Sequence, residues 1–97
     1  MIKNPTKKLH HHLPHSTQAE RILARFGNGY DLSRYLKQVA EATGNANYYR
    51  SPSVIYRWAY PRQRGGCDGL IPNAAMPGVL LAAKVAGIFL TDEDTRP

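Results

Sequence analysis

The segment between Ser51 and Pro61 constrains the fold more than any other part of this 97-residue chain. Ser51 followed by Pro52 is typical of a helix start, because serine caps free backbone amides and proline at the first helical position gives up no hydrogen bond. Pro61 then ends the helix, since proline lacks the amide that a helix interior needs. We therefore expect a short helix from Pro52 to about Tyr60.

Two helices are expected before this segment. Thr17 and Glu20 have the spacing of a capping box, and Gly27 ends the helix that they start. Asp31 is placed to cap a second helix, which Gly44 ends. Apolar residues at helical spacing predict the buried faces, which are Ala19, Ile22, Leu23 and Phe26 in the first helix and Leu32, Leu36, Val39 and Ala40 in the second.

Two more helical segments are expected after it. The first starts near Met76, because Pro77 suits the first turn of a helix, and it ends at Gly87. It is apolar nearly all round, which indicates burial on more than one side, by its own domain or by a partner. A final helical turn runs from Thr91, a capping residue, to Asp94.

These elements predict a single all-α domain. The chain is too short for two hydrophobic cores, and the expected architecture is a compact four- to five-helix bundle over 17–97. The stretches 45–50 and 61–69 are rich in turn formers and predict loops, the second flexible, glycine-rich and cationic. Residues 1–16 hold three lysines, four histidines and almost no large apolar group, so we expect a flexible, basic and His-rich N-terminal arm.

The charge is unevenly distributed along the chain. Thirteen Lys and Arg against seven Asp and Glu give a net charge of +6, and residues 1–67 hold eleven of the basic groups but three of the acidic ones. This excess predicts a polyanionic partner for the first two-thirds of the chain, with charge that serves only solubility as the alternative. The basic arm is expected either to lie in a DNA groove or to remain an untethered tail.

Other classes of function lack support in the sequence. The lone Cys67 excludes a disulfide framework and fits a reducing cytosol, and neighbouring histidines on a flexible arm do not form a fixed coordination shell. We expect no metal and no cofactor. No apolar run reaches the ~20 residues of a membrane span and no secretory signal is apparent, which predicts a cytoplasmic protein with no membrane partner. No catalytic triad, carboxylate pair or phosphate loop is apparent, so we expect no enzyme.

Four residues around the Ser51 helix carry a resemblance to a known family. Ala40 and Gly44 match the alanine and turn glycine of a helix-turn-helix motif, and Ile55 and Trp58 match its two inward apolar positions. On these residues the chain resembles the small Cro-like and lambda-repressor-like regulators of bacteria and their phages. Gly44 and Ile55 are eleven positions apart, about five more than in the family's pattern, which predicts an enlarged turn over 45–49.

A longer string is similar to a group of small prophage-type helix-turn-helix proteins of proteobacteria. It comprises Ser51 to Trp58, Pro61-Arg62, Gly65-Gly66, Gly69, Ile71-Pro72 and a tail with Ile88, Leu90, Thr91 and Asp94. The resemblance covers roughly 17–97 and implies a DNA-binding domain whose recognition helix starts at Pro52.

The resemblance and the helix pattern together predict a DNA interface. The residues expected to read bases in the major groove are Ser53, Tyr56 and Arg57. Those expected to hold phosphates are Arg50, Ser51, Tyr60, Arg62 and Arg64. Those expected in the core of the motif are Ala40, Ile55 and Trp58. Arg57 is the main candidate for base readout, because its planar fork can bond guanine O6 and N7 together.

Three functions fit this pattern. The first is a sequence-specific regulator of transcription, a phage-type repressor that binds a double-stranded DNA operator as a homodimer. The second is a small protein-interaction factor, either a binder of the host transcription machinery or an antitoxin. Tyr48 and Tyr49 in the enlarged turn favour it, because exposed tyrosines are common at interfaces. The third is a DNA-binding protein of packaging or recombination.

Overall fold

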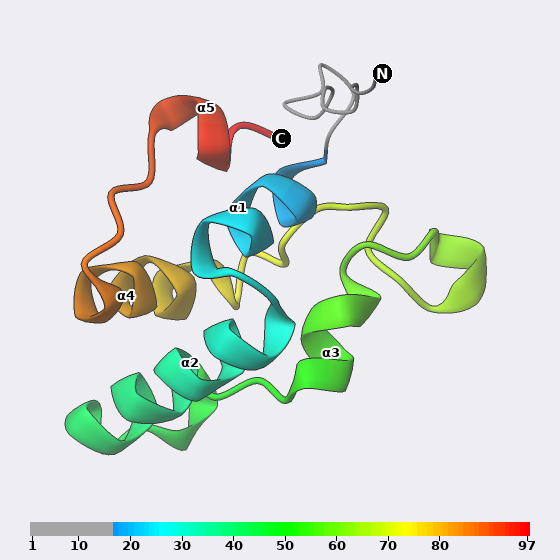
Figure 1. Cartoon of the computed structure of the whole chain (residues 1–97). Coiled ribbons are helices and arrows are strands. Elements are labelled where there is room, and N and C mark those ends of the chain that lie inside the picture. Colours follow the sequence, from blue (N-terminus) through cyan, green and yellow to red (C-terminus); the bar gives the residue numbers. More distant parts are fainter. Residues whose placement is uncertain (1–16) are drawn as a thin grey trace, which may run out of the picture.

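A computed structural model describes residues 17–97, and within that range every regular element is helical. The α-helices and the two short 3-10 turns are α1 (Gln18–Phe26), α2 (Gly29–Thr43), η2 (Ala46–Tyr48), α3 (Pro52–Arg57), η3 (Arg62–Arg64), α4 (Met76–Ala86) and α5 (Asp92–Thr95) (Figure 1). The all-α prediction is confirmed for this part of the chain. The arm expected at 1–16, with its histidines, lies outside the described residues.

The helix starts follow the local signals with one exception. Thr17 and Glu20 form the predicted capping box at α1, and the Ser51 side chain caps α3. The cap of α2 is Asn28 and not Asp31, because Asn28 Oδ1 accepts a hydrogen bond from the Asp31 amide at 2.8 Å. Asp31 thereby falls in the first turn, where its carboxylate faces the positive end of the helix.

The α3 helix is shorter than predicted. It ends at Arg57 with Trp58 as its C-cap, and the amides of 58–60 bond to carbonyls three residues back in tight turns. The loop expected at 61–69 is also more ordered than its glycine content predicts, since it contains η3 and hydrogen bonds that close its base.

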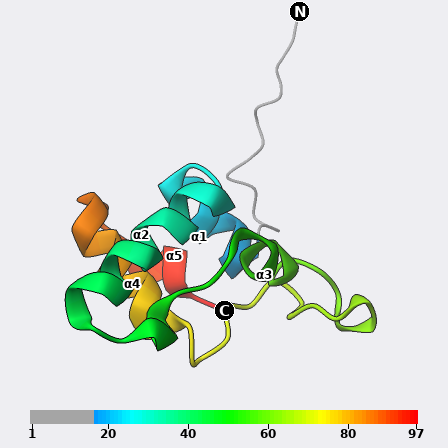
Figure 2. The same ribbon diagram turned by 90° about the horizontal axis from the view of Figure 1, so that it is seen from below.

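The α2 helix lies at the centre of the fold and packs against α1, α3 and α4 (Figure 2). The buried apolar side chains form one core, which contains Ala19, Ile22, Phe26, Leu32, Leu36, Val39, Ile55, Trp58, Ile71, Ala75, Val79, Ala82 and Ala83. Ile55 and Trp58 are therefore core residues, as their spacing predicts. Ala40 is only half-buried.

The link between α2 and α3 runs back along α2 instead of turning sharply at its end. The Ser33 hydroxyl donates to the carbonyl of Arg50 at 2.7 Å, although Ser33 precedes the last residue of α2, Thr43, by ten positions. That separation is about 15 Å along a helix axis. α3 consequently lies beside the first half of α2, whereas a tight turn would place it at the end of that helix.

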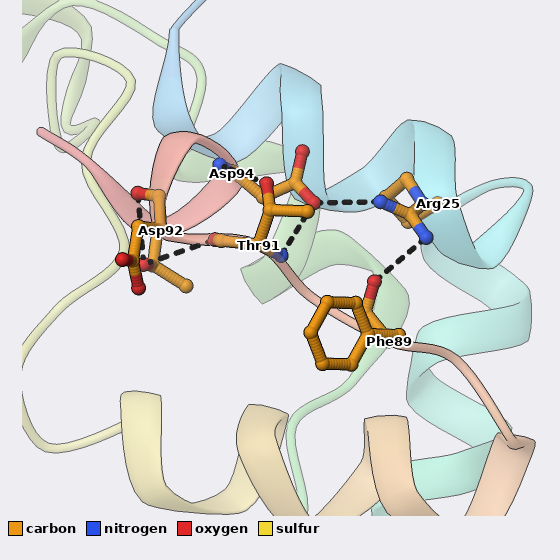
Figure 3. Close-up of polar contacts among 6 residues, drawn as sticks. Arg25, Phe89, Thr91, Asp92 and Asp94 are labelled. Carbon is orange, nitrogen blue, oxygen red and sulfur yellow. Dashed lines mark hydrogen bonds and ion pairs between the residues drawn. The ribbon is translucent and has the colours of Figure 1, made fainter.

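The C-terminal segment lies against α1. The Arg25 guanidinium donates to Asp94 Oδ2 at 2.6 Å and to the Phe89 carbonyl at 2.7 Å (Figure 3). Thr91 caps α5, and its amide donates to Asp94 Oδ2 at 2.9 Å. Burial raises the pKa of Asp94, but hydrogen bonds from Thr91 and the charge of Arg25 outweigh it, so that the pKa lies below its ordinary value.

Gln18 joins α1 to two distant segments. Its side chain is buried, donates to the Thr95 carbonyl at 2.6 Å and accepts from the Ile71 amide at 2.8 Å. Both polar atoms of the amide group are therefore paired inside the fold. None of the helices in residues 17–97 has the length and apolar character needed to cross a bilayer.

Candidate nucleic-acid interface

The α3 helix divides its side chains between core and surface. Ile55 and Trp58 face inward, and Trp58 is only 2% exposed. Ser53 and Arg57 are one helical turn apart and both exposed. Arg57 forms no ion pair or hydrogen bond with any residue in the described range 17–97. Its five donors are thus free to bind a ligand.

Tyr56, predicted to read bases, is half-buried at the junction of α3 and α2. Its hydroxyl accepts from the Gly29 amide at 3.0 Å, and its ring meets that of Tyr30 edge-on, 6.0 Å between centroids. A Cβ on Gly29 would lie 2.8 Å from the Tyr56 ring, so this contact needs glycine. The hydroxyl retains one proton that can be donated outward.

Arg50 and Ser51 lie at the start of α3 and are engaged locally. The Arg50 guanidinium donates to the carbonyls of Asn47 and Tyr49, which folds it back onto the enlarged turn. Ser51 Oγ lies 3.4 Å from the Val54 amide that it caps. These bonds use only Nη1 of Arg50 and an acceptor lone pair of Ser51, so Nη2 and Nε of Arg50 and the hydroxyl proton of Ser51 remain able to donate to a phosphate.

The segment from Tyr60 to Gly69, here called the basic loop, projects from the body of the fold beside α3 (Figures 1 and 2). Asp68 holds it closed, because its two carboxylate oxygens accept from the Arg62 backbone amide and from Arg62 Nε, each at 2.8 Å. The backbone hydrogen bond from Arg62, and next its side-chain bond, keep the pKa of Asp68 below its ordinary value. The sequence pattern did not single out Asp68, because its role depends on this closed loop.

Tyr60 and Arg64 lie together on the basic loop. The Arg64 guanidinium carbon is 5.4 Å from the centre of the Tyr60 ring, within the range of a cation–π contact. Both side chains are exposed, and no carboxylate in residues 17–97 pairs with Arg64. Four sequence-predicted residues of α3 and the loop that follows it are exposed and form no ion pair in the described chain: Ser53, Arg57, Tyr60 and Arg64. The Ser53 hydroxyl lies 3.3 Å from Ser51 Oγ.

A second exposed feature lies on α4. The helix is buried on one side only, where Val79, Ala82 and Ala83 join the core, and Leu80 and Val85 remain exposed. Phe89, just beyond the helix, is 77% exposed, the largest such value among the exposed large apolar residues of the described chain. It borders an open depression of about 290 Å³ lined by Leu80, Ala83, Lys84, Ile88, Phe89 and Leu90. This apolar surface is here called the α4 face.

Residues 17–97 bring no three His, Cys, Asp or Glu side chains together in a group that could hold a metal ion. Cys67 is a half-buried free thiol on the basic loop. Comparison with protein-family models, with curated proteins and with solved structures found no match.

Proposed function

We propose that this protein is a sequence-specific double-stranded DNA-binding regulator of transcription that places α3 in the major groove. The observation that carries the proposal is Arg57: it is exposed, unpaired within the described chain and one helical turn from Ser53 on the outer face of α3. The major groove, about 12 Å wide, admits one α-helix, and arginine reads guanine there through two hydrogen bonds.

The inner face of α3 supports this role. Ile55 and Trp58 anchor the helix in the core, while the Tyr56 hydroxyl fixes it to the start of α2. A base-reading side chain gains specificity when the helix that carries it is held rigidly. The proposed motif differs from a tight helix-turn-helix, because the link between its helices retraces α2 as far as Ser33.

We further propose that the protein binds its operator as a homodimer and represses transcription from it. A single module of this size buries too little surface for tight specific binding, and two copies double the site. The α4 face offers a projecting Phe89 beside an open depression. A two-fold interface requires such self-complementary shape, since each copy contributes the same patch.

The test is a selection from duplex DNA with a randomised centre, followed by fluorescence polarisation of the selected duplex at two salt concentrations. Binding at least ~10³-fold tighter than to random duplex supports a specific regulator. Placing the selected sequence in a promoter that drives a reporter then tests repression. Equal, weak and strongly salt-dependent binding to both duplexes contradicts the proposal, because phosphate contacts alone account for it.

The α4 face also favours a second function, a small factor that binds a protein of the host. Phe89, Leu80 and Val85 would then contact that protein in place of a second copy. This alternative would be favoured if the protein co-purifies with a single host protein in stoichiometric amount and does not bind DNA. The Phe89→Asp variant should then lose that partner.

A further inference from the structure

The basic loop is held in one shape by several hydrogen bonds. The Asp68 amide donates to the Tyr60 carbonyl at 2.9 Å, and the Gly69 amide donates to the Trp58 carbonyl at 2.8 Å. Gly66 packs against the backbone of Tyr60 at the base of the loop, where a Cβ would lie 2.1 Å from the Tyr60 carbonyl oxygen, so only glycine fits this close approach. A loop ordered in advance loses little conformational freedom when it binds.

The two arginines of the basic loop have different surroundings. Arg62 is bound through its backbone amide and its Nε to Asp68, so a carboxylate offsets its charge, although its guanidinium remains exposed. Arg64 faces no carboxylate in the described chain and lies against the Tyr60 ring. Arg62 therefore holds the basic loop in shape, and Arg64 is the cation that the loop presents to a ligand.

We propose that the basic loop binds the minor groove of A·T-rich DNA flanking the site of α3, with Arg64 as the inserted side chain. This inference rests on the proposed function. The minor groove is about 6 Å wide, too narrow for a helix but wide enough for one arginine side chain, and it is narrower and more negative in A-tracts. Gly65 follows Arg64 and has open space where a side chain would lie, so the turn beside Arg64 carries no bulk that would block entry.

The position of the loop beside α3 suits this placement. Successive major and minor grooves on one side of B-DNA are about 17 Å apart, half a helical turn. Arg64 follows Arg57 by seven residues, which sets an upper limit of about 25 Å on the distance between their Cα atoms, and the turns at 58–60 and 62–64 make it shorter. The loop projects away from the body on the same side of the molecule as α3 (Figures 1 and 2). One protein surface can thus meet both grooves.

The test exploits a difference between base pairs that is visible only in the minor groove. In the selected duplex, the A·T pairs flanking the α3 site are replaced by G·C or by inosine·cytosine. A G·C pair adds a donor, the guanine 2-amino group, to the minor groove; inosine lacks this group but keeps the major-groove pattern of guanine. We expect G·C flanks to weaken binding about 5- to 100-fold and inosine·cytosine flanks to restore it.

Arg64→Ala should abolish this flank preference and leave base discrimination at the α3 site unchanged. Lys37→Ala removes an exposed charge from α2 instead and serves as the control. Asp68→Asn should weaken the flank preference, because it removes the carboxylate that holds the basic loop closed. The inference is overturned if inosine·cytosine flanks behave like G·C flanks, or if Arg64→Ala weakens binding to all flanks alike while Arg57→Ala still relaxes base choice. Failure to select any specific duplex overturns the proposed function and this inference together.

Discussion

The Tyr56 hydroxyl accepts a hydrogen bond from the Gly29 amide at 3.0 Å, which joins the outer half of α3 to the first turn of α2. The amide is one of those that an α-helix leaves unpaired at its N-terminus. Tyr56→Phe removes the acceptor of the Gly29 amide. The variant should lower the unfolding free energy, measured by urea denaturation, by about 0.5 to 1.5 kcal/mol.

Gly29→Ala should destabilise the fold more than Tyr56→Phe, because the added methyl group would lie 2.8 Å from the tyrosine ring. Gly44→Ala is a useful comparison, since it tests backbone strain at a left-handed position with no atom within 4 Å. If Tyr56→Phe instead leaves stability unchanged and alters base preference, the hydroxyl serves DNA contact and not packing.

Arg57→Ala should cost about 1 to 3 kcal/mol on the specific duplex and relax preference at one base position. Arg57→Lys separates the two contributions, because lysine keeps the charge but loses the planar fork. We expect the lysine variant to retain binding to random duplex and to lose the base preference. Equal losses on specific and random duplexes would show that Arg57 holds a phosphate.

Arg62→Ala should weaken binding to specific and random duplexes and, because Arg62 shapes the basic loop, should also reduce the preference for A·T flanks. The structure gives a reason that differs from direct phosphate contact. Removal of the guanidinium leaves Asp68 bonded only to the backbone amide of residue 62, so its negative charge beside the DNA is no longer offset by a cation. The Arg62→Ala/Asp68→Asn double variant should therefore recover part of the lost affinity in polarisation titrations. Additive losses in the two single variants would contradict this coupling.

The α4 face should control self-association. Phe89→Asp places a charge where the dimer would bury an apolar side chain, so it should shift equilibrium sedimentation from dimer to monomer. The variant should remain folded, because Phe89 is exposed in the single chain. Leu70→Asp, which changes an exposed leucine outside the α4 face, is the matched control. Monomers at every concentration of the unaltered protein would exclude the homodimer.

Acid should release α5 from α1. The pKa of Asp94 is lowered in the folded chain, so its carboxylate stabilises the fold above its ordinary value near 3.8 and loses this effect as pH falls through the lower, folded value. We expect amide exchange in 89–96 to accelerate in that range before the core opens. Asp94→Asn should remove the pH dependence, whereas Asp92→Asn, an exposed neighbour, should retain it.

Local signals predicted much of the fold. The Thr17 and Glu20 capping box and the proline that starts α3 act within one turn of the chain, so residue type alone reveals them. The start of α2 was harder, because Asn28 and Asp31 both favour cap positions and only the folded backbone decides between them. The inward spacing of Ile55 and Trp58 likewise predicted their burial correctly.

Contacts through backbone carbonyls could not be predicted. Ser33 holds the carbonyl of Arg50, and Arg25 holds the carbonyl of Phe89; a carbonyl looks the same at every residue, so no sequence pattern marks these pairs. The same limit applies to the candidate site. The sequence grouped Arg62 with Arg64 as phosphate ligands, and only the position of Asp68 shows how their surroundings differ.

The pairing of Gln18 with Thr95 has a consequence for biosynthesis. These residues are 77 positions apart, so α1 leaves the ribosome long before its polar partner is made. Contacts so distant in sequence form late and slow the folding of small domains. Until translation passes Thr95, the Gln18 side-chain amide lacks this acceptor, and the contact between α1 and α5 cannot form. The contact between α1 and α5 is therefore completed only after α5 has been synthesised, and we expect a chain stopped before Phe89 to be more sensitive to proteases than the full chain.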